Sequence, residues 1–273
     1  MGKITVRLST FLLGAAALCA LVSYFGFHRV RAQGQGISRV PFTLIYVLRA
    51  ESTRSNAKME ERMYEAHQSD GSKAEGPVDP NSARSRALAV ASRRMVMRVS
   101  DALRMKSTEY VEPAPGGETA PKVRPNKCAT GKSGMDYVGQ DTILGLSTFH
   151  HVLKFVDGAL TISQDVWMYR ELGCVVVQMR MASRDKSGAV TSISERIPIS
   201  LTIGEPDPAL FEVDAGYTEV KPSEFMVGLA RADLFRRGDA TAAANPPVPE
   251  QAQREWAKMD QKYQESQKFK PLN

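Results

Sequence analysis

The chain has 273 residues, of which 42% are hydrophobic and 24% are charged, so most of it is expected to fold around a core. Its formal net charge is +6, but four of the basic residues stand in 1–32, a stretch that holds no acidic residue. The rest of the chain therefore carries 32 basic and 30 acidic side chains. This balance excludes the concentrated basic surface of a typical nucleic-acid-binding protein.

Residues 1–32 predict an export signal. Lys3 and Arg7 precede an uncharged run, and Val30 and Ala32 occupy the two small-residue positions of a cleavage site. An uncleaved N-terminal anchor is the alternative, because the uncharged run is only slightly shorter than a membrane-spanning helix. In either case we expect the rest of the chain in the periplasm or on the outer face of the cytoplasmic membrane. Membrane contact is then expected only through 1–32, if that segment is retained.

Export affects both the number and the expected redox state of the cysteines. Removal of Cys19 with the signal leaves Cys128 and Cys174. In an oxidising compartment an even pair is most simply explained by a disulfide, and two buried free thiols are the alternative. A metal site is disfavoured because neither cysteine has a histidine or another cysteine at ligand spacing. We therefore expect no metal and no cofactor.

Two-residue hydrophobic alternation dominates the chain after residue 39, and it is typical of strands. The segments that show it are 41–50, 143–155, 160–169, 175–181 and 193–203. Turn sequences at Asp157-Gly158 and at 185–188 separate successive segments, which is the pattern of an antiparallel meander. The fold class is therefore expected to be mainly β (α+β), with a single antiparallel sheet domain over 33–238.

Two further segments are ambiguous. Residues 56–68 have helical propensity but lead directly into the hairpin signal at 69–72, so we expect a strand in their second half. The alternation over 87–110 predicts two strands, broken near Asp101. A run rich in proline and glycine over 111–126 predicts a loop.

The C-terminal part predicts helices. Pro222 favours the start of a helix that continues to Phe235, and Gly238 is a typical stop signal. Residues 239–273 predict a linker followed by a partly helical tail. In that tail, 250–270 carries a narrow apolar stripe among many charges, which does not favour a membrane-surface helix.

Motifs that would indicate catalysis are incomplete. Residues 131–133 read Gly-Lys-Ser, the end of a phosphate-binding loop, but Asn126 stands where that loop needs a glycine. His150 and His151 are neighbours on a predicted strand, so their side chains point to opposite faces and cannot ligate one ion from that geometry. The sequence has no Gly-x-Ser-x-Gly turn and no cysteine beside a plausible activating base. These observations predict a protein without enzymatic activity.

Three stretches carry a family resemblance. Residues 139–145 lead into a strand, 166–174 form an aromatic strand that ends in a cysteine, and 211–217 follow the last long strand. In this order they resemble uncharacterised exported bacterial proteins related to the outer-membrane lipoprotein carriers. The resemblance implies a curved antiparallel sheet, a half-barrel, over one or two helices. It also implies that Cys128 pairs with Cys174.

The patterning of the strands suggests a function. Several predicted strands are apolar on both faces, and such a sheet must be covered on both. Since strong helix patterns are few, part of one face is left for an apolar guest. We therefore expect a non-enzymatic cell-envelope protein that binds a lipid, another apolar ligand or an envelope protein partner, but no nucleic acid. The alternative is a structural or regulatory protein-interaction module without a small-molecule ligand.

Overall fold

The structure is a computed structural model, and it describes residues 40–53, 56–82, 84–91, 94–111, 128, 135–236 and 238–269. The predicted export signal at 1–32, the Gly-Lys-Ser motif at 131–133 and most of the loop predicted at 111–126 lie outside these residues. Among the helices in the described ranges, none is both long and apolar enough to cross a membrane.

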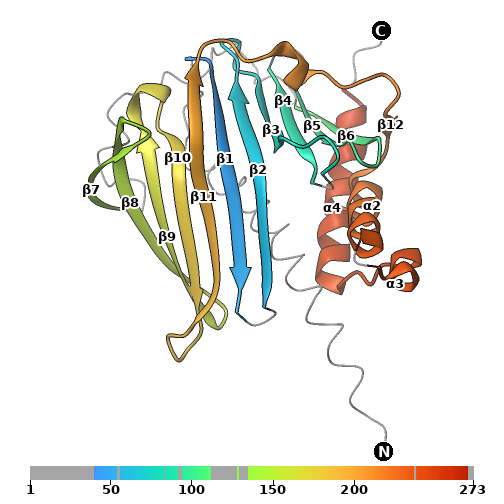
Figure 1. The fold of residues 1–273 in the computed structure, drawn as a ribbon. Helices are drawn as coiled ribbons and strands as arrows, with labels where there is room; N and C mark the ends of the chain where they lie inside the picture. Colours follow the sequence, from blue (N-terminus) through green and yellow to red (C-terminus); the bar gives the residue numbers. More distant parts are fainter. Residues whose placement is uncertain are drawn as a thin grey trace, which may run out of the picture. The chain divides into compact units, whose positions relative to one another are not determined.

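Twelve strands form one large open sheet that does not close into a barrel (Figure 1). Their order across the sheet is β12-β6-β5-β4-β3-β2-β1-β11-β10-β9-β8-β7. The strands are β1 (Phe42–Ser52), β2 (Ala57–His67), β3 (Lys73–Pro77), β4 (Arg86–Val90), β5 (Met95–Ser100), β6 (Met105–Tyr110), β7 (Asp136–Ile143), β8 (Leu146–Asp157), β9 (Leu160–Tyr169), β10 (Val175–Arg184), β11 (Val190–Ile203) and β12 (Thr218–Glu219). The short β12 pairs with β6 in parallel, so the sheet is mixed rather than purely antiparallel. The prediction of a mainly β fold with a few helices is confirmed.

The chain divides into two compact units. Unit 1 contains Leu44–Glu61 and Ala120–Leu201, and so most of β1, the first part of β2, and β7 to β11. Unit 2 contains Arg39–Thr43, Arg62–Thr119 and Thr202–Asn273, and so the rest of β2, β3 to β6, β12 and the helices. The boundary predicted at 238 between a sheet domain and a tail stays a prediction.

Hairpins of unit 1 follow the predicted meander. The turn at Asp157-Gly158 joins β8 to β9, and Gly158 adopts a φ of 60°, which glycine tolerates without strain. Between β10 and β11, the carboxylate of Asp185 accepts a hydrogen bond from the backbone N–H of Ser187 at 2.9 Å, which closes the turn.

Two segments depart from the prediction. β2 is a strand along its whole length, because side chains of its first half pair with β1, Lys58 with Glu51 and Glu60 with Arg49. The segment predicted as two strands over 87–110 contains parts of three. β4 and β5 separate at a turn that ends at Arg94, whose φ is 49°, and the predicted break at Asp101 separates β5 from β6.

The described residues of unit 2 contain three α-helices, α2 (Pro222–Arg236), α3 (Ala240–Ala244) and α4 (Glu250–Gln267), and the short 3-10 helix η2 (Pro208–Phe211). Both α2 and α4 agree with the prediction, and Gly238 follows α2 with a φ of 80°. The short α3 forms where the sequence predicts a linker, since the side chain of Asp239 accepts a hydrogen bond from the N–H of Ala242 at 2.9 Å. Helix α4 packs against α2 and β6.

The tail helix is fixed by polar contacts as well as packing. The Asp260 carboxylate of α4 accepts hydrogen bonds from the backbone and hydroxyl of Ser223, at 2.9 and 2.6 Å, at the start of α2. Tyr263 donates its hydroxyl to Glu219 at 3.2 Å. Burial and this nearby carboxylate raise the pKa of Tyr263 to about 12.

Each unit has its own buried residues. In unit 1, Leu44, Val166 and Val177 expose at most 2% of their surface. In unit 2, Leu88 and Phe225 expose 1% each.

Strand β7 ends the sheet order on the side of unit 1. It pairs with β8, and their register shifts between Tyr137 and Gly139. The extra residue at this bulge, Val138, is 58% exposed. A bulge of this kind interrupts the regular ladder of hydrogen-bonding groups that an edge strand would otherwise offer.

Candidate functional site

One face of unit 1 is predominantly apolar. Residues that pair directly across neighbouring strands share a face, and such pairs join Phe149 to Met168 and Phe155 to Ile162. Further along the same face, Met179 pairs with Val166. We call this surface the apolar face; its apolar side chains are Tyr46 and Leu48 of β1, Phe149, Leu153 and Phe155 of β8, Ile162, Val166 and Met168 of β9, and Met179 and Met181 of β10.

Most side chains of the apolar face are neither buried nor fully exposed. Val166 and Tyr46 are buried, whereas Phe155, Met168 and Met179 keep partial exposure. Contiguous apolar surface that keeps access to solvent is typical of a binding site for another apolar group. The apolar face is therefore the candidate functional site.

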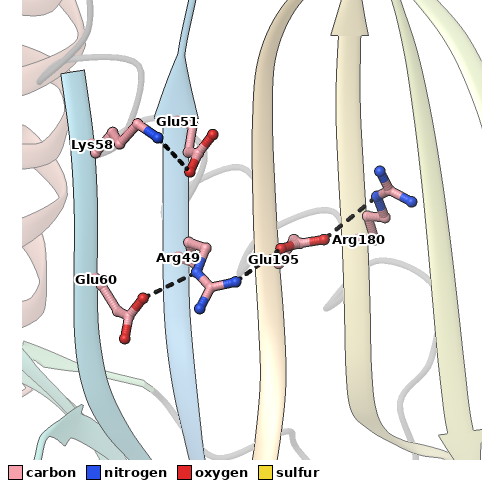
Figure 2. A network of polar contacts seen from close by, with 6 residues as sticks. All are labelled: Arg49, Glu51, Lys58, Glu60, Arg180 and Glu195. Atoms are coloured by element: carbon pink, nitrogen blue, oxygen red, sulfur yellow. Dashed lines mark hydrogen bonds and ion pairs between the residues drawn. The ribbon is translucent and has the colours of Figure 1, made fainter. Parts of the chain in front are cut away.

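The opposite face of the same strands carries ion pairs of alternating sign (Figure 2). Arg49 of β1 lies between two carboxylates, 3.0 Å from Glu60 of β2 and 3.9 Å from Glu195 of β11. Glu195 in turn contacts Arg180 of β10 at 3.5 Å. A further pair at the end of these strands joins Lys58 to Glu51 at 3.3 Å.

These pairs define what we call the charged face. Each partly exposed pair contributes little to stability, so their main effect is to keep this side of the sheet hydrated. Ile193 and Ile197 flank Glu195 along β11, which adds apolar side chains to the charged face. The charge is therefore concentrated in a row rather than spread evenly.

The charged face continues onto β9, β8 and β7 through an aromatic cluster. His150 stacks on Trp167 with ring centres 4.4 Å apart and planes 10° from parallel. The Nε2 atom of His150 lies 3.0 Å from the Asp165 carboxylate, and the indole N–H of Trp167 donates to Asp141 at 2.7 Å. Since every polar group named here has a partner within the cluster, its geometry fits a structural role.

His151 lies on the apolar face, opposite to His150. It is 1% exposed, and its Nε2–H donates to the backbone carbonyl of Cys128. Burial lowers the pKa of His151, so its imidazole is kept neutral. The prediction that the two histidines point to opposite faces is confirmed by these contacts. Among the described residues, no group of three or more His, Cys, Asp or Glu side chains is arranged to hold a metal ion.

Cys128 and Cys174 form a disulfide with their Cα atoms 5.6 Å apart. Cys174 follows a short 3-10 helix, η1 (Arg170–Leu172), and both it and Gly173 adopt positive φ values, 69° and 73°. Cys128 is buried, and its carbonyl contacts His151. The disulfide therefore helps to hold Cys128 at the apolar face, where its carbonyl contacts His151.

Unit 2 contains a separate polar cluster. Arg86 contacts both oxygens of Asp101, at 2.8 and 2.9 Å, in a bidentate pair. Tyr217, from the 211–217 stretch, donates its hydroxyl to Asp101, and the Arg104 guanidinium lies 4.9 Å from the Tyr217 ring centre. Burial, followed by the Asp101 contact, raises the pKa of Tyr217, and burial raises that of Tyr64. Tyr217 stays protonated and donates to the Asp101 carboxylate, whose charge Arg86 balances. This hydrogen bond fixes the 211–217 stretch to the Arg86–Asp101 pair.

Comparison with known proteins gives a limited result. No protein-family model matches the sequence. No curated protein matches it either. Solved structures do match, and among them is the MucA/MucB complex of Pseudomonas aeruginosa, with 14% identity, 71% of this chain and 62% of that chain covered, and a TM-score of 0.39. This chain therefore spans less than two thirds of the length of that structure.

Two further matches come from the superfamily that the sequence resemblance names. A LolA-superfamily protein from Nitrosomonas europaea is 10% identical, with 67% of this chain and 96% of that chain covered and a TM-score of 0.28. A putative outer-membrane lipoprotein-sorting protein domain from Vibrio parahaemolyticus is 12% identical, with 69% and 95% covered and a TM-score of 0.21.

Proposed function

We propose that the protein is a non-enzymatic cell-envelope protein that binds a lipid or another apolar ligand on the apolar face of unit 1. The observation that carries this proposal is the segregation of side chains across the sheet. Partly exposed methionine and phenylalanine side chains gather on one face of β8, β9 and β10, and a row of ion pairs lies on the opposite face of the sheet, from β10 across β11 and β1 to β2.

The composition of the apolar face suits a flexible ligand. Met168, Met179 and Met181 are unbranched and adapt their shape to an apolar partner, while Phe149 and Phe155 add large apolar area. Burial of this surface by a ligand is favourable by roughly 25 cal/mol for each Å² removed from water.

Two observations support the location in the envelope. The sequence of 1–32 predicts export, and the Cys128–Cys174 disulfide is typical of an oxidising compartment. A thiol pair of this kind would stay reduced in the cytosol of most cells.

The proposal is tested by binding of N-phenylnaphthylamine, an uncharged apolar dye whose fluorescence rises in apolar surroundings. Phe155 and Val156 are neighbours on β8 and point to opposite faces. Phe155→Glu places a charge on the apolar face, so we expect it to weaken dye binding at least about 10-fold. Val156→Glu is the matched control, because Val156 is 73% exposed and lies outside the site.

The expected result is saturable binding by the wild-type protein that Phe155→Glu loses and Val156→Glu keeps. Far-ultraviolet circular dichroism of both variants checks that they fold. Absence of saturable binding by the wild-type protein, or equal loss in the two variants, contradicts the proposal and favours the interaction module without a small-molecule ligand.

A further inference from the structure

Arg196 places a positive charge on the apolar face. It pairs across strands with Met179, and its guanidinium lies 4.1 Å from the ring centre of Tyr46. Among apolar side chains, a guanidinium adds a charged group that attracts an anion, which a purely apolar surface does not. Its presence in the middle of this face therefore indicates a chemical preference in what the face binds.

One carboxylate shares this face. Glu60 points to the charged face, where it pairs with Arg49, so its neighbour Glu61 points to the apolar face. Glu61 is partly exposed and, like Arg196, belongs to unit 1. Polar groups thus stand toward β2 and β11, whereas the methionine and phenylalanine side chains stand on β8, β9 and β10.

We propose that the ligand of the apolar face is an amphiphile with an anionic head group, a carboxylate or a phosphate, that binds to Arg196. This inference rests on the proposed function. The guanidinium presents its N–H donors in a planar fork that matches the oxygens of either head group. The acyl chain lies from Met179 across the neighbouring side chains of β9 and β8, and Glu61 competes with the head group for the cation.

The test compares three ligands that share one chain and differ in the head: oleate, oleoyl lysophosphatidate and oleyl alcohol. Each is added below its micelle concentration, and its displacement of N-phenylnaphthylamine from the wild-type protein is measured. Because a charge-assisted hydrogen bond is about twice as strong as a neutral one, we expect both acids to bind about 10-fold more tightly than the alcohol. Acetate, which has the carboxylate without the chain, is expected not to displace the dye.

Three variants locate the preference. Arg196→Gln is expected to reduce acid binding about 10-fold and leave alcohol binding unchanged, which removes the difference between them. Glu61→Gln is expected to tighten acid binding, since it removes the competing carboxylate. Arg180→Gln is the matched control, because Arg180 contacts Glu195 on the charged face.

Two results overturn the inference: equal binding of acids and alcohol by the wild-type protein, or a preference for acids that survives Arg196→Gln. In both cases alcohol binding still supports the proposed function. Failure of all three ligands to displace the dye, or absence of dye binding, counts against the proposed function itself, so the two failures are distinguishable.

Discussion

Removal of the disulfide is expected to destabilise unit 1 and leave unit 2 unaffected. The change is Cys128→Ser with Cys174→Ser. The two cysteines are 46 positions apart in the sequence, and both lie in unit 1. A cross-link that closes a loop of this length reduces the entropy of the unfolded chain, which stabilises the folded state by about 4 kcal/mol.

The two tryptophans make the assay selective. Trp167 lies in β9 of unit 1 and Trp256 in α4 of unit 2, so Trp256→Phe and Trp167→Phe backgrounds report the units separately. Urea unfolding is followed by fluorescence in each background, with and without the disulfide. With a typical slope near 2 kcal/mol per molar urea, the Trp167 midpoint is expected to fall by about 2 M.

The Trp256 midpoint is the internal control and is expected to stay constant, because no described contact of the disulfide involves unit 2. A fall of less than about 0.5 M in the Trp167 midpoint would refute the reasoning, since the bridge would then not be limiting the freedom of the unfolded chain.

Two other predictions concern the largely buried ion pair of Arg86 with Asp101 and the buried His151. Asp101→Ala leaves the Arg86 cation largely buried without its bidentate partner, so we expect a loss of about 3–5 kcal/mol in the Trp256-monitored stability of unit 2. The double variant Arg86→Met with Asp101→Leu is expected to lose less, and an equal or greater loss contradicts this account. His151 has a lowered pKa in the folded state, so the unfolded chain binds its proton more readily, and stability is expected to fall as pH drops below the ordinary histidine value near 6.5. His151→Gln keeps a donor for the Cys128 carbonyl but does not titrate; midpoints at pH 7.5 and pH 5.0 are expected to differ less in this variant, and an unchanged difference would show that His151 is not responsible.

Local patterns were sufficient for much of the fold. Alternation placed a strand at 160–169, the same bounds as β9, and the turn residues at Asp157-Gly158 and 185–188 placed the hairpins. The same rule placed His150 and His151 on opposite faces. These features are determined by residues close in sequence, so short sequence patterns are enough to predict them.

Features set by distant residues were harder to predict. The first half of β2 has helical propensity, but its residues form ion pairs with β1, and tertiary pairing outweighs local preference. Strand β11 shows the strongest alternation in the sequence, yet Ile193 and Ile197 lie on the charged face beside Glu195. Its contribution to the apolar face includes Arg196 instead.

The reason is that alternation separates two faces without saying which face of one strand adjoins which face of the next. That choice depends on register between strands, and a shift of one residue exchanges the faces. The apolar face and its cation therefore emerge only when the pairings of Arg196 with Met179 and of Met179 with Val166 are known.

The bulge in β7 has a consequence for the behaviour of the protein at high concentration. An uninterrupted outermost strand can recruit a strand from another molecule and so begin an aggregate. Here Val138 breaks the repeat and Asp136 and Asp141 add negative charge, so a second copy finds neither matched backbone groups nor a neutral surface. We expect this protein to resist aggregation through β7 at high concentration, so that its molecules remain separate.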